Sequence, residues 1–129
     1  MAIRAWRWLA VLAILFAVAV PKSASAGQAS VLDATVRANP GGTYAFSATI
    51  FHKDEGWKHY ADAFEILNSN GVVLGTRILY HPHVDEQPFT RSLSKVEIPI
   101  GVNQVKVRAK CKIHGPGKRV VTLTLPPRR

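Results

Sequence analysis

The chain has 129 residues, with 17 Lys and Arg against 8 Asp and Glu, and a single cysteine. This length suits one domain with one modest core. One cysteine excludes an internal disulfide, so packing has to supply the stability of the fold. The net charge of +9 is not accompanied by any nucleic-acid-binding motif, so we expect no nucleic-acid partner.

The N-terminal segment has the pattern of a secretory signal peptide. Arg4 and Arg7 form a basic start, residues 9–20 are an unbroken apolar run, and Ala24-Ser25-Ala26 supplies small residues for cleavage. The run is shorter than the roughly 20 apolar residues of an ordinary membrane span. We therefore expect a signal-peptide helix in residues 1–26 and cleavage after Ala26. An uncleaved N-terminal anchor is the alternative.

Cleavage there leaves residues 27–129 as one periplasmic or secreted domain. No cysteine lies near the cut, so we expect no lipid anchor of the lipoprotein type and no stable membrane anchor. All eight acidic residues lie between Asp33 and Glu97, and eight Lys or Arg lie from Gly101 onward. Such a basic face attracts anionic lipid, polysaccharide or an acidic partner. The alternative, which we favour, is a solvated strand face with a frayed basic tail.

Residues 27–129 show no amphipathic helix pattern. Short segments of alternating or β-branched residues, separated by Gly, Pro and Asn, are typical of strands. A spacing of roughly 8–14 residues between such segments predicts an all-β antiparallel sandwich. The seven predicted strands are residues 31–38, 43–52, 60–68, 72–80, 89–98, 104–111 and 119–125.

Two of these segments alternate with the period of two that a half-buried sheet requires. One inward face ends at Cys111, which we interpret as a small core residue, with a ligand or reactive thiol as the alternative. His52, at the end of the second strand, is interpreted as surface. The two inward faces are Tyr44, Phe46, Ala48 and Ile50 in the second strand, and Val105, Val107, Ala109 and Cys111 in the sixth.

The C-terminal part resembles a fibronectin type III module. Residues 90–98, the Pro99-Ile100-Gly101 turn and residues 105–109 are similar to the fifth and sixth strands of that module, and Gly115-Pro116-Gly117 is similar to its last hairpin loop. The resemblance implies a seven-stranded fibronectin type III or immunoglobulin-like sandwich. A second resemblance, to small exported bacterial proteins of unassigned function, implies no mechanism; it is carried by Gly56-Trp57, residues 59–62, His81-Pro82-His83 and residues 87–92.

The turn between the third and fourth strands decides which side chains share a face. A two-residue Asn70-Gly71 turn would pair Ser69 with Val72, whereas a three-residue loop with Gly71 left-handed would pair Asn68 with Val72. A one-residue slip turns every side chain to the other face. We choose the three-residue loop because it keeps the apolar sets together. It groups Tyr60, Phe64 and Ile66 with Leu74, Ile78 and Tyr80, turns Glu65 and Arg77 outward, and leaves Asp62 on the inner face.

This register predicts a histidine cluster. His59 would lie opposite His81 on the outer face, with Cβ atoms about 4.5–5.5 Å apart. A strand continuing through Pro82 would point His83 the same way. Zinc and copper accept three such imidazole ligands. Further candidate ligands are Asp85, Glu86 and His114, the last at Cys-x-x-His spacing from Cys111.

The fibronectin resemblance also implies that the loops at residues 52–59, 81–88 and 112–118 lie at one pole. All five histidines fall on or beside these loops. Trp57 and Arg91 are candidate partner-binding residues there. Their structural alternatives are that Trp57 covers the end of the core and that Arg91 faces out or pairs with an acid such as Asp62.

Three functional classes remain. The first is an exported, non-catalytic binding module that takes copper or zinc at the histidine pole. The second is a structural domain, or one that contacts an exported protein or glycan through the same pole without metal. The third is an enzyme; a catalytic zinc with three histidines is conceivable, but the chain has no nucleophile elbow and no convincing catalytic triad. We expect the first class, with the second as the alternative.

Overall fold

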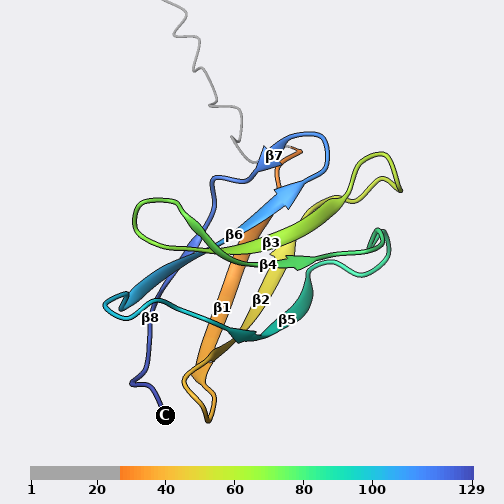
Figure 1. Ribbon diagram of the computed structural model, residues 1–129. Coiled ribbons are helices and arrows are strands. Elements are labelled where there is room, and N and C mark those ends of the chain that lie inside the picture. Colours follow the sequence, from red (N-terminus) through yellow and green to blue (C-terminus); the bar gives the residue numbers. More distant parts are fainter. Residues whose placement is uncertain (1–26) are drawn as a thin grey trace, which may run out of the picture.

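The computed structural model describes residues 27–129, and the predicted signal peptide of residues 1–26 lies outside the described residues. The described chain is all-β and forms two antiparallel sheets that stack as two layers (Figure 1). Within this part of the chain no helix is long and apolar enough to cross a membrane. The strands are β1 Ser30–Ala38, β2 Tyr44–Phe51, β3 Ala61–Leu67, β4 Val73–Ile78, β5 Phe89–Val96, β6 Gln104–Cys111, β7 Gly115–Pro116 and β8 Val121–Thr124.

Each of the seven predicted segments overlaps one of these strands, and β7 is an addition to them. One sheet has the order β1-β2-β5. The other has the order β4-β3-β6, and both β7 and β8 pair with β6. The expected hairpin loop at Gly115-Pro116-Gly117 is therefore wrong in part, because Gly115 and Pro116 pair with Cys111 and Lys110.

The core lies between the two layers. The inward faces of β2 and β6 are buried as their alternation predicts, and Cys111 is only 1% exposed, which confirms it as a core residue. Phe89 at the start of β5 is likewise buried in this core. Burial of each of the larger apolar side chains stabilises the folded state by about 1.5–3 kcal/mol. Since Cys111 is the single cysteine and is free, this packing carries the stability.

The β3–β4 hairpin begins in the expected register and then slips. The Asn68 amide donates to the Val72 carbonyl at 2.9 Å, and Gly71 has a φ of 80°, so the three-residue loop is confirmed. A bulge next to Ile66 then shifts the pairing by one residue, and Ile66 pairs with Gly75 instead of Leu74. Side chains of β4 beyond the bulge therefore point to the face opposite to the expected one.

The slip has visible consequences in β4. Arg77 shares the face of Phe64, with which it pairs, and its Nη1 donates to the Ser92 carbonyl of the facing sheet at 2.9 Å. Ile78 is 45% exposed on the other face. The expectation that Ile78 faces inward and Arg77 outward is thus wrong. Gly75 lies close to β5, since a Cβ at this position would be 3.1 Å from a Val96 methyl carbon.

The predicted pairing of His59 with His81 is also wrong. β3 begins at Ala61 and β4 ends at Ile78, and the hairpin closes with the Leu79 amide donating to the Asp62 carbonyl at 2.9 Å. Both histidines therefore lie beyond the paired strands. A three-histidine site built on that pairing loses its geometric basis.

Candidate metal centre

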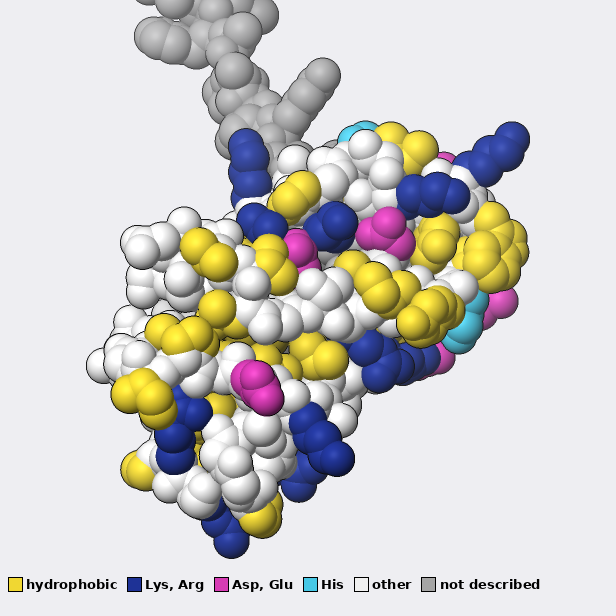
Figure 2. Space-filling model, in the orientation of Figure 1, with side chains coloured by type: hydrophobic (Ala, Val, Ile, Leu, Met, Phe, Trp, Pro, Cys, Tyr) yellow, Lys and Arg dark blue, Asp and Glu magenta, His cyan; other side chains and the backbone are white. Residues whose placement is uncertain are grey.

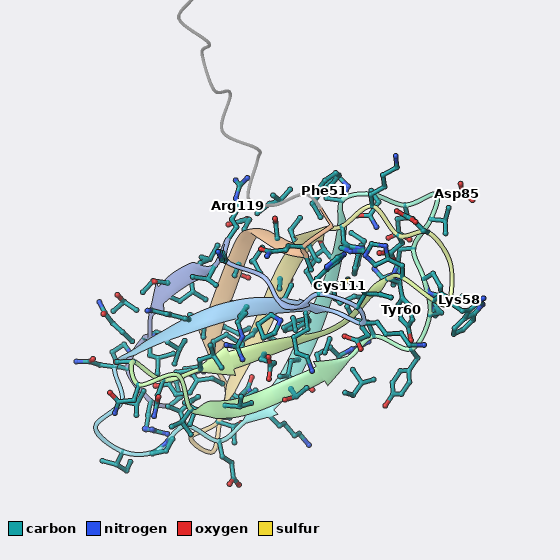
Figure 3. The ribbon with its side chains drawn as sticks, turned by 90° about the horizontal axis from the view of Figure 1, so that it is seen from above. Phe51, Lys58, Tyr60, Asp85, Cys111 and Arg119 are labelled. Carbon is teal, nitrogen blue, oxygen red and sulfur yellow. The ribbon has the colours of Figure 1, made fainter. Side chains whose placement is uncertain are left out.

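The candidate site lies at the end of the core where β2 and β6 finish. His52 follows β2 and continues the inward face of that strand one step beyond Ile50. Cys111 is the last inward residue of β6, and its position at that strand end is seen in Figure 3. The two strands belong to opposite layers, so their inward ends meet across the core. Both side chains are 1% exposed, and the interpretation of His52 as surface is wrong.

His59 joins this pair from the loop that precedes β3. Its ring lies edge-on to the His52 ring, with centroids 4.8 Å apart. One ligand atom from each of His52, His59 and Cys111 lies within 4.8 Å of the others. Donors on one zinc ion sit about 2.0–2.3 Å from it, so closure on an ion needs only a small contraction. This His/His/Cys group could therefore bind a metal.

A carboxylate faces the Nδ1 atom of each imidazole in the group. Asp54 Oδ1 lies 2.6 Å from His52 Nδ1, and Glu55 Oε1 lies 3.5 Å from His59 Nδ1. An ionised carboxylate only accepts, so it favours a proton on the Nδ1 atom that faces it. His59 Nε2 is buried and has no hydrogen-bond partner among the described residues, so this imidazole is oriented as metal-bound histidines usually are. His52 Nε2 lies 3.2 Å from the Gly27 carbonyl oxygen, so a metal bound there would have to displace that contact.

Asp54 connects the site to the rest of the pole. Its side chain is fully buried, and Oδ1 also accepts from the Ala61 amide at 3.0 Å at the start of β3. Oδ2 accepts from the His83 amide at 2.7 Å, in the loop between β4 and β5. Asp54 is thus a buried carboxylate that accepts from two backbone amides. Asp62 Oδ1 is buried without a hydrogen-bond partner in the described chain.

His114 lies next to the group, in the turn between β6 and β7. Its ring centroid is 5.0 Å from that of His59, with the planes at 68°. The His59 ring thus contacts both the His52 ring and the His114 ring, and Cys111 belongs to the same cluster. His114 is exposed, whereas Cys111 is buried, so His114 lies on the solvent side of the group.

His81 and His83 form a second histidine pair, with ring centroids 4.6 Å apart. His83 is 6% exposed and stacks on Phe89 at 4.0 Å. Arg91 Nη2 lies 3.0 Å from His83 Nε2 and donates to it, so that nitrogen is already occupied. Burial, and then the positive charge of Arg91, lowers the pKa of His83 below its usual value. A metal role for His81 and His83 stays a prediction.

The remaining predicted residues surround these clusters. Arg91 pairs with Glu86 at 3.3 Å, so it does find an acid, but not Asp62. Asp85 and Glu86 are exposed in the β4–β5 loop. Trp57 is 64% exposed and packs edge-on to Tyr60, so the expectation that it covers the end of the core is wrong. Figure 2 shows exposed hydrophobic side chains gathered beside histidine at this end of the molecule.

His52 and Asp54 are the site residues that the sequence interpretation missed. A usable pattern existed for His52, because it continues the period-two face of Tyr44, Phe46, Ala48 and Ile50. An imidazole at the end of a buried face needs polar partners. The acid two residues later, Asp54, was the nearest candidate for that partner.

Comparison with known proteins finds a related sequence in Halomicrobium mukohataei. That protein is named "Putative lipoprotein" and is 36% identical over 96 residues, which are 74% of this chain and 47% of the relative. The chain thus spans about half the length of the curated relative that it matches. No family model matches the chain, and no solved structure matches it.

Proposed function

We propose that this chain is an exported, non-catalytic module that binds copper or zinc through His52, His59 and Cys111. The convergence of two imidazoles and one thiol at the end of the core carries the proposal. Two nitrogens and one sulfur suit zinc and copper better than magnesium or calcium, which prefer oxygen ligands. The carboxylates at both Nδ1 atoms add support, because metal-bound histidines usually donate their other ring N–H to such a group.

Export is supported by two independent features. The first 26 residues have the composition of a signal peptide. The relative carries a name that describes a lipoprotein, a class of exported protein. We propose that the mature domain acts in the periplasm or in the medium.

The sandwich itself is proposed to be of the fibronectin type III kind. Support comes from the division of strands, with β1, β2 and β5 in one layer and β3, β4, β6 and β8 in the other. In such a fold the loops at one pole vary while the sheets stay constant, so a binding site there is expected.

Metal content and affinity test the proposed function. Residues 27–129 contain every strand of both sheets, and this domain would be purified and titrated with Zn²⁺ and with Cu⁺ in competition with a chromophoric chelator. We expect a single site with a Kd tighter than about 10 µM. Co²⁺ would serve as a spectroscopic probe, since a thiolate ligand gives an intense charge-transfer band in the near ultraviolet.

Substitutions then locate the site. His52→Ala, His59→Ala and Cys111→Ala should each weaken binding by tenfold or more, which corresponds to about 1.4 kcal/mol. Lys53→Ala is the control, because Lys53 is exposed next to His52 and is not a proposed ligand. Circular dichroism would confirm that each variant is folded. Unchanged affinity in the first three variants, or no binding by the native domain, would contradict the proposal.

A protein or glycan partner is the second candidate function. The observation that favours it is the exposure of aromatic rings at the same pole, with Trp57 64% and Tyr80 76% exposed. Exposed aromatic side chains commonly anchor partners. Glycan-panel binding that is lost in Trp57→Ala and insensitive to chelators would support this function. Binding that vanishes on metal removal would contradict it.

A further inference from the structure

The outer face of the β1-β2-β5 sheet presents a row of hydroxyl groups. The other sheet packs on the inner face, and the outer side chains of these strands are largely exposed. Thr35 pairs with Ser47, and Ser47 pairs with Ser92, so the three hydroxyls lie side by side across the strands. Neighbouring strands are about 4.7–4.9 Å apart, and the hydroxyls therefore repeat at about that spacing.

The same face is hollowed beside this row. One hollow of about 330 Å³ contains the hydroxyl row in its lining, and a second of about 540 Å³ lies against the hairpin of residues 39–43. Arg37 and Ser94 line both hollows, so the two are continuous. We call this space the hydroxyl groove; its main polar side chains are those of Thr35, Arg37, Ser47, Ser92, Ser94 and Lys95. An elongated groove suits a chain-like ligand.

Ala45 lies between two cationic side chains of the groove. It pairs with Arg37 of β1, and the register shift on its other side sets Ser94 and Lys95 of β5 opposite it. β1 and β5 are two strand spacings apart, about 9.5 Å, so two long cationic side chains can reach one anionic group between them. Neither cation takes part in an ion pair among the described residues.

Lys95 has a backbone conformation that lysine adopts at a cost. Its φ is 55°, and it is the one non-glycine residue with positive φ in the described chain. It lies in the β2–β5 bulge, and bulges of this kind re-aim side chains next to binding sites. Glycine or asparagine would satisfy this conformation more easily. Strained positions concentrate at functional sites, so a lysine kept here indicates a ligand with negative charge.

The hairpin at the end of the groove is already ordered. The Asn39 amide donates to the Thr43 carbonyl at 2.8 Å, and Asn39 Nδ2 donates to Thr43 Oγ1 at 3.1 Å. Arg128 Nη1, from the C-terminal segment, donates to the Gly42 carbonyl at 2.9 Å. A wall that is formed in advance does not have to be ordered when a ligand binds.

We propose that the hydroxyl groove binds an acidic polysaccharide, with a carboxylate of the sugar chain between Arg37 and Lys95 and sugar hydroxyls along the Thr35 row. Charge complementarity favours this ligand, because no acidic residue of the described chain lines either hollow. Each protein hydroxyl both donates and accepts, as sugar hydroxyls do. Pro40 is the one exposed apolar residue in the described lining, so the groove lacks the aromatic anchors of protein partners.

This second site is separate from the proposed metal centre. Ala45 lies near the beginning of β2, whereas His52 follows the end of that strand, so the two sites are at opposite ends of the fold. The groove shares no residue with His52, His59 and Cys111. Polysaccharide binding and metal binding can therefore be tested independently.

Titration of the domain of residues 27–129 with short oligomers of galacturonate and of mannuronate tests the proposal. Calorimetry would be carried out with a metal chelator present. At least one oligomer should bind with a Kd below about 1 mM at low salt, and its affinity should fall by about fivefold or more in about 0.5 M salt. The methyl-esterified form of the same oligomer is the matched control ligand, since it has the same sugars without the charge.

Three substitutions locate the ligand. Arg37→Gln and Lys95→Gly each remove one cation and should weaken binding by about fivefold or more. Ala45→Leu fills the space between the cations without changing the charge, and it should have a similar effect. Lys106→Gln is the control, because Lys106 is an exposed lysine on β6 of the other sheet. Lys95→Gly should unfold at the same temperature as the native domain or higher, because glycine accepts a φ of 55°.

Each remaining outcome would overturn the proposal. These outcomes are no binding of either acidic oligomer, equal affinity for the esterified oligomer, an equal loss in Lys106→Gln, or full affinity in Ala45→Leu. A lower unfolding temperature of Lys95→Gly would show that the lysine serves the fold instead. Loss of oligomer binding in His52→Ala would place the ligand at the other end of the molecule. Failure of the domain to bind Zn²⁺ or Cu⁺ would contradict the metal function alone.

Discussion

His52 Nδ1 and Asp54 Oδ1 lie 2.6 Å apart at the end of the core, and both side chains are buried. This contact holds the His52 ring in place, with its other nitrogen, Nε2, 3.2 Å from the Gly27 carbonyl oxygen. Asp54 also accepts amide protons from Ala61 and His83. One buried carboxylate therefore organises both the proposed metal ligands and the loops around them.

Replacing Asp54 should affect both stability and metal affinity. Asp54→Asn presents N–H groups to donors, and we expect a loss of about 3 kcal/mol in the free energy of unfolding, because a buried unsatisfied group costs about 1–3 kcal/mol. Metal affinity should fall by about 10–100-fold. Urea denaturation and metal titration would measure the two effects. Glu97→Gln, at an exposed acidic residue outside the site, is the control; a similar loss there would contradict the assignment.

Stability should fall as the pH falls, in part through His83. Its folded-state pKa is lowered, chiefly by burial and then by Arg91 and His81, with Asp54 and Glu86 acting in the opposite direction. The unfolded chain therefore takes up the proton first, and stability is lost as the pH falls through about 6.5, by up to about 1.4 kcal/mol per pH unit.

Urea denaturation between pH 7.5 and pH 5 would measure this dependence. His83→Gln should flatten the curve, because a residue that does not titrate contributes nothing to the slope. His114→Gln, at an exposed histidine that is not among the groups that shift the His83 pKa, is the control. An unchanged slope in His83→Gln would show that other groups cause the pH dependence.

Glu65 and Arg108 should be energetically coupled across β3 and β6. Arg108 Nη2 donates to Glu65 Oε1 at 2.9 Å, and Glu65 is 8% exposed. Removing Arg108 leaves a poorly hydrated carboxylate without its partner, so Arg108→Ala should cost about 2 kcal/mol, less than the 3–5 kcal/mol of a fully buried pair. Lys106→Ala, on an exposed residue of the same strand, should cost less than about 0.5 kcal/mol.

A double-mutant cycle would establish the coupling. The variant Glu65→Leu/Arg108→Leu should be more stable than Arg108→Ala, because no unpaired charge remains. A coupling energy near zero between the two positions would mean that the pair contributes nothing beyond the packing of its side chains.

Gly117 should tolerate substitution far less than Gly75. A Cβ on Gly117 would overlap the Ala29 carbonyl oxygen, a backbone atom that cannot rotate away, whereas a Cβ on Gly75 meets a Val96 methyl group that can shift. We expect Gly117→Ala to cost about 3 kcal/mol and Gly75→Ala about 1 kcal/mol or less. Thermal unfolding would compare the loss of stability in the two variants. Equal losses would show that the segment around Ala29 can move away from position 117. Faster amide hydrogen exchange at Val31 should accompany Gly117→Ala alone.

Much of the fold could be predicted from local patterns. Each predicted strand segment overlaps an observed strand, and the inward faces of β2 and β6 are buried as expected. These predictions succeed because a half-buried strand must alternate with a period of two, whatever its neighbours are. The Ser69-Asn70-Gly71 loop succeeds for a similar reason, since a left-handed glycine is a local requirement.

The register beyond the loop was decided by tertiary packing. The bulge at Ile66 places Gly75 against β5 and lets Arg77 reach Ser92 on the other sheet. No local pattern specifies such a bulge, because the contacts that reward it come from a different layer. His59 was consequently expected beside His81, whereas it lies beside His52 and His114.

The sequence by itself determined that histidines concentrate on three loops and that Cys111 ends an inward face. Only the tertiary structure decided which of them meet. His52 and Cys111 come from strands in opposite sheets, and their juxtaposition depends on how the two layers stack. Strand periodicity defines the face on which a residue lies, but the distance between two strand ends is set by the packing of the whole core between them.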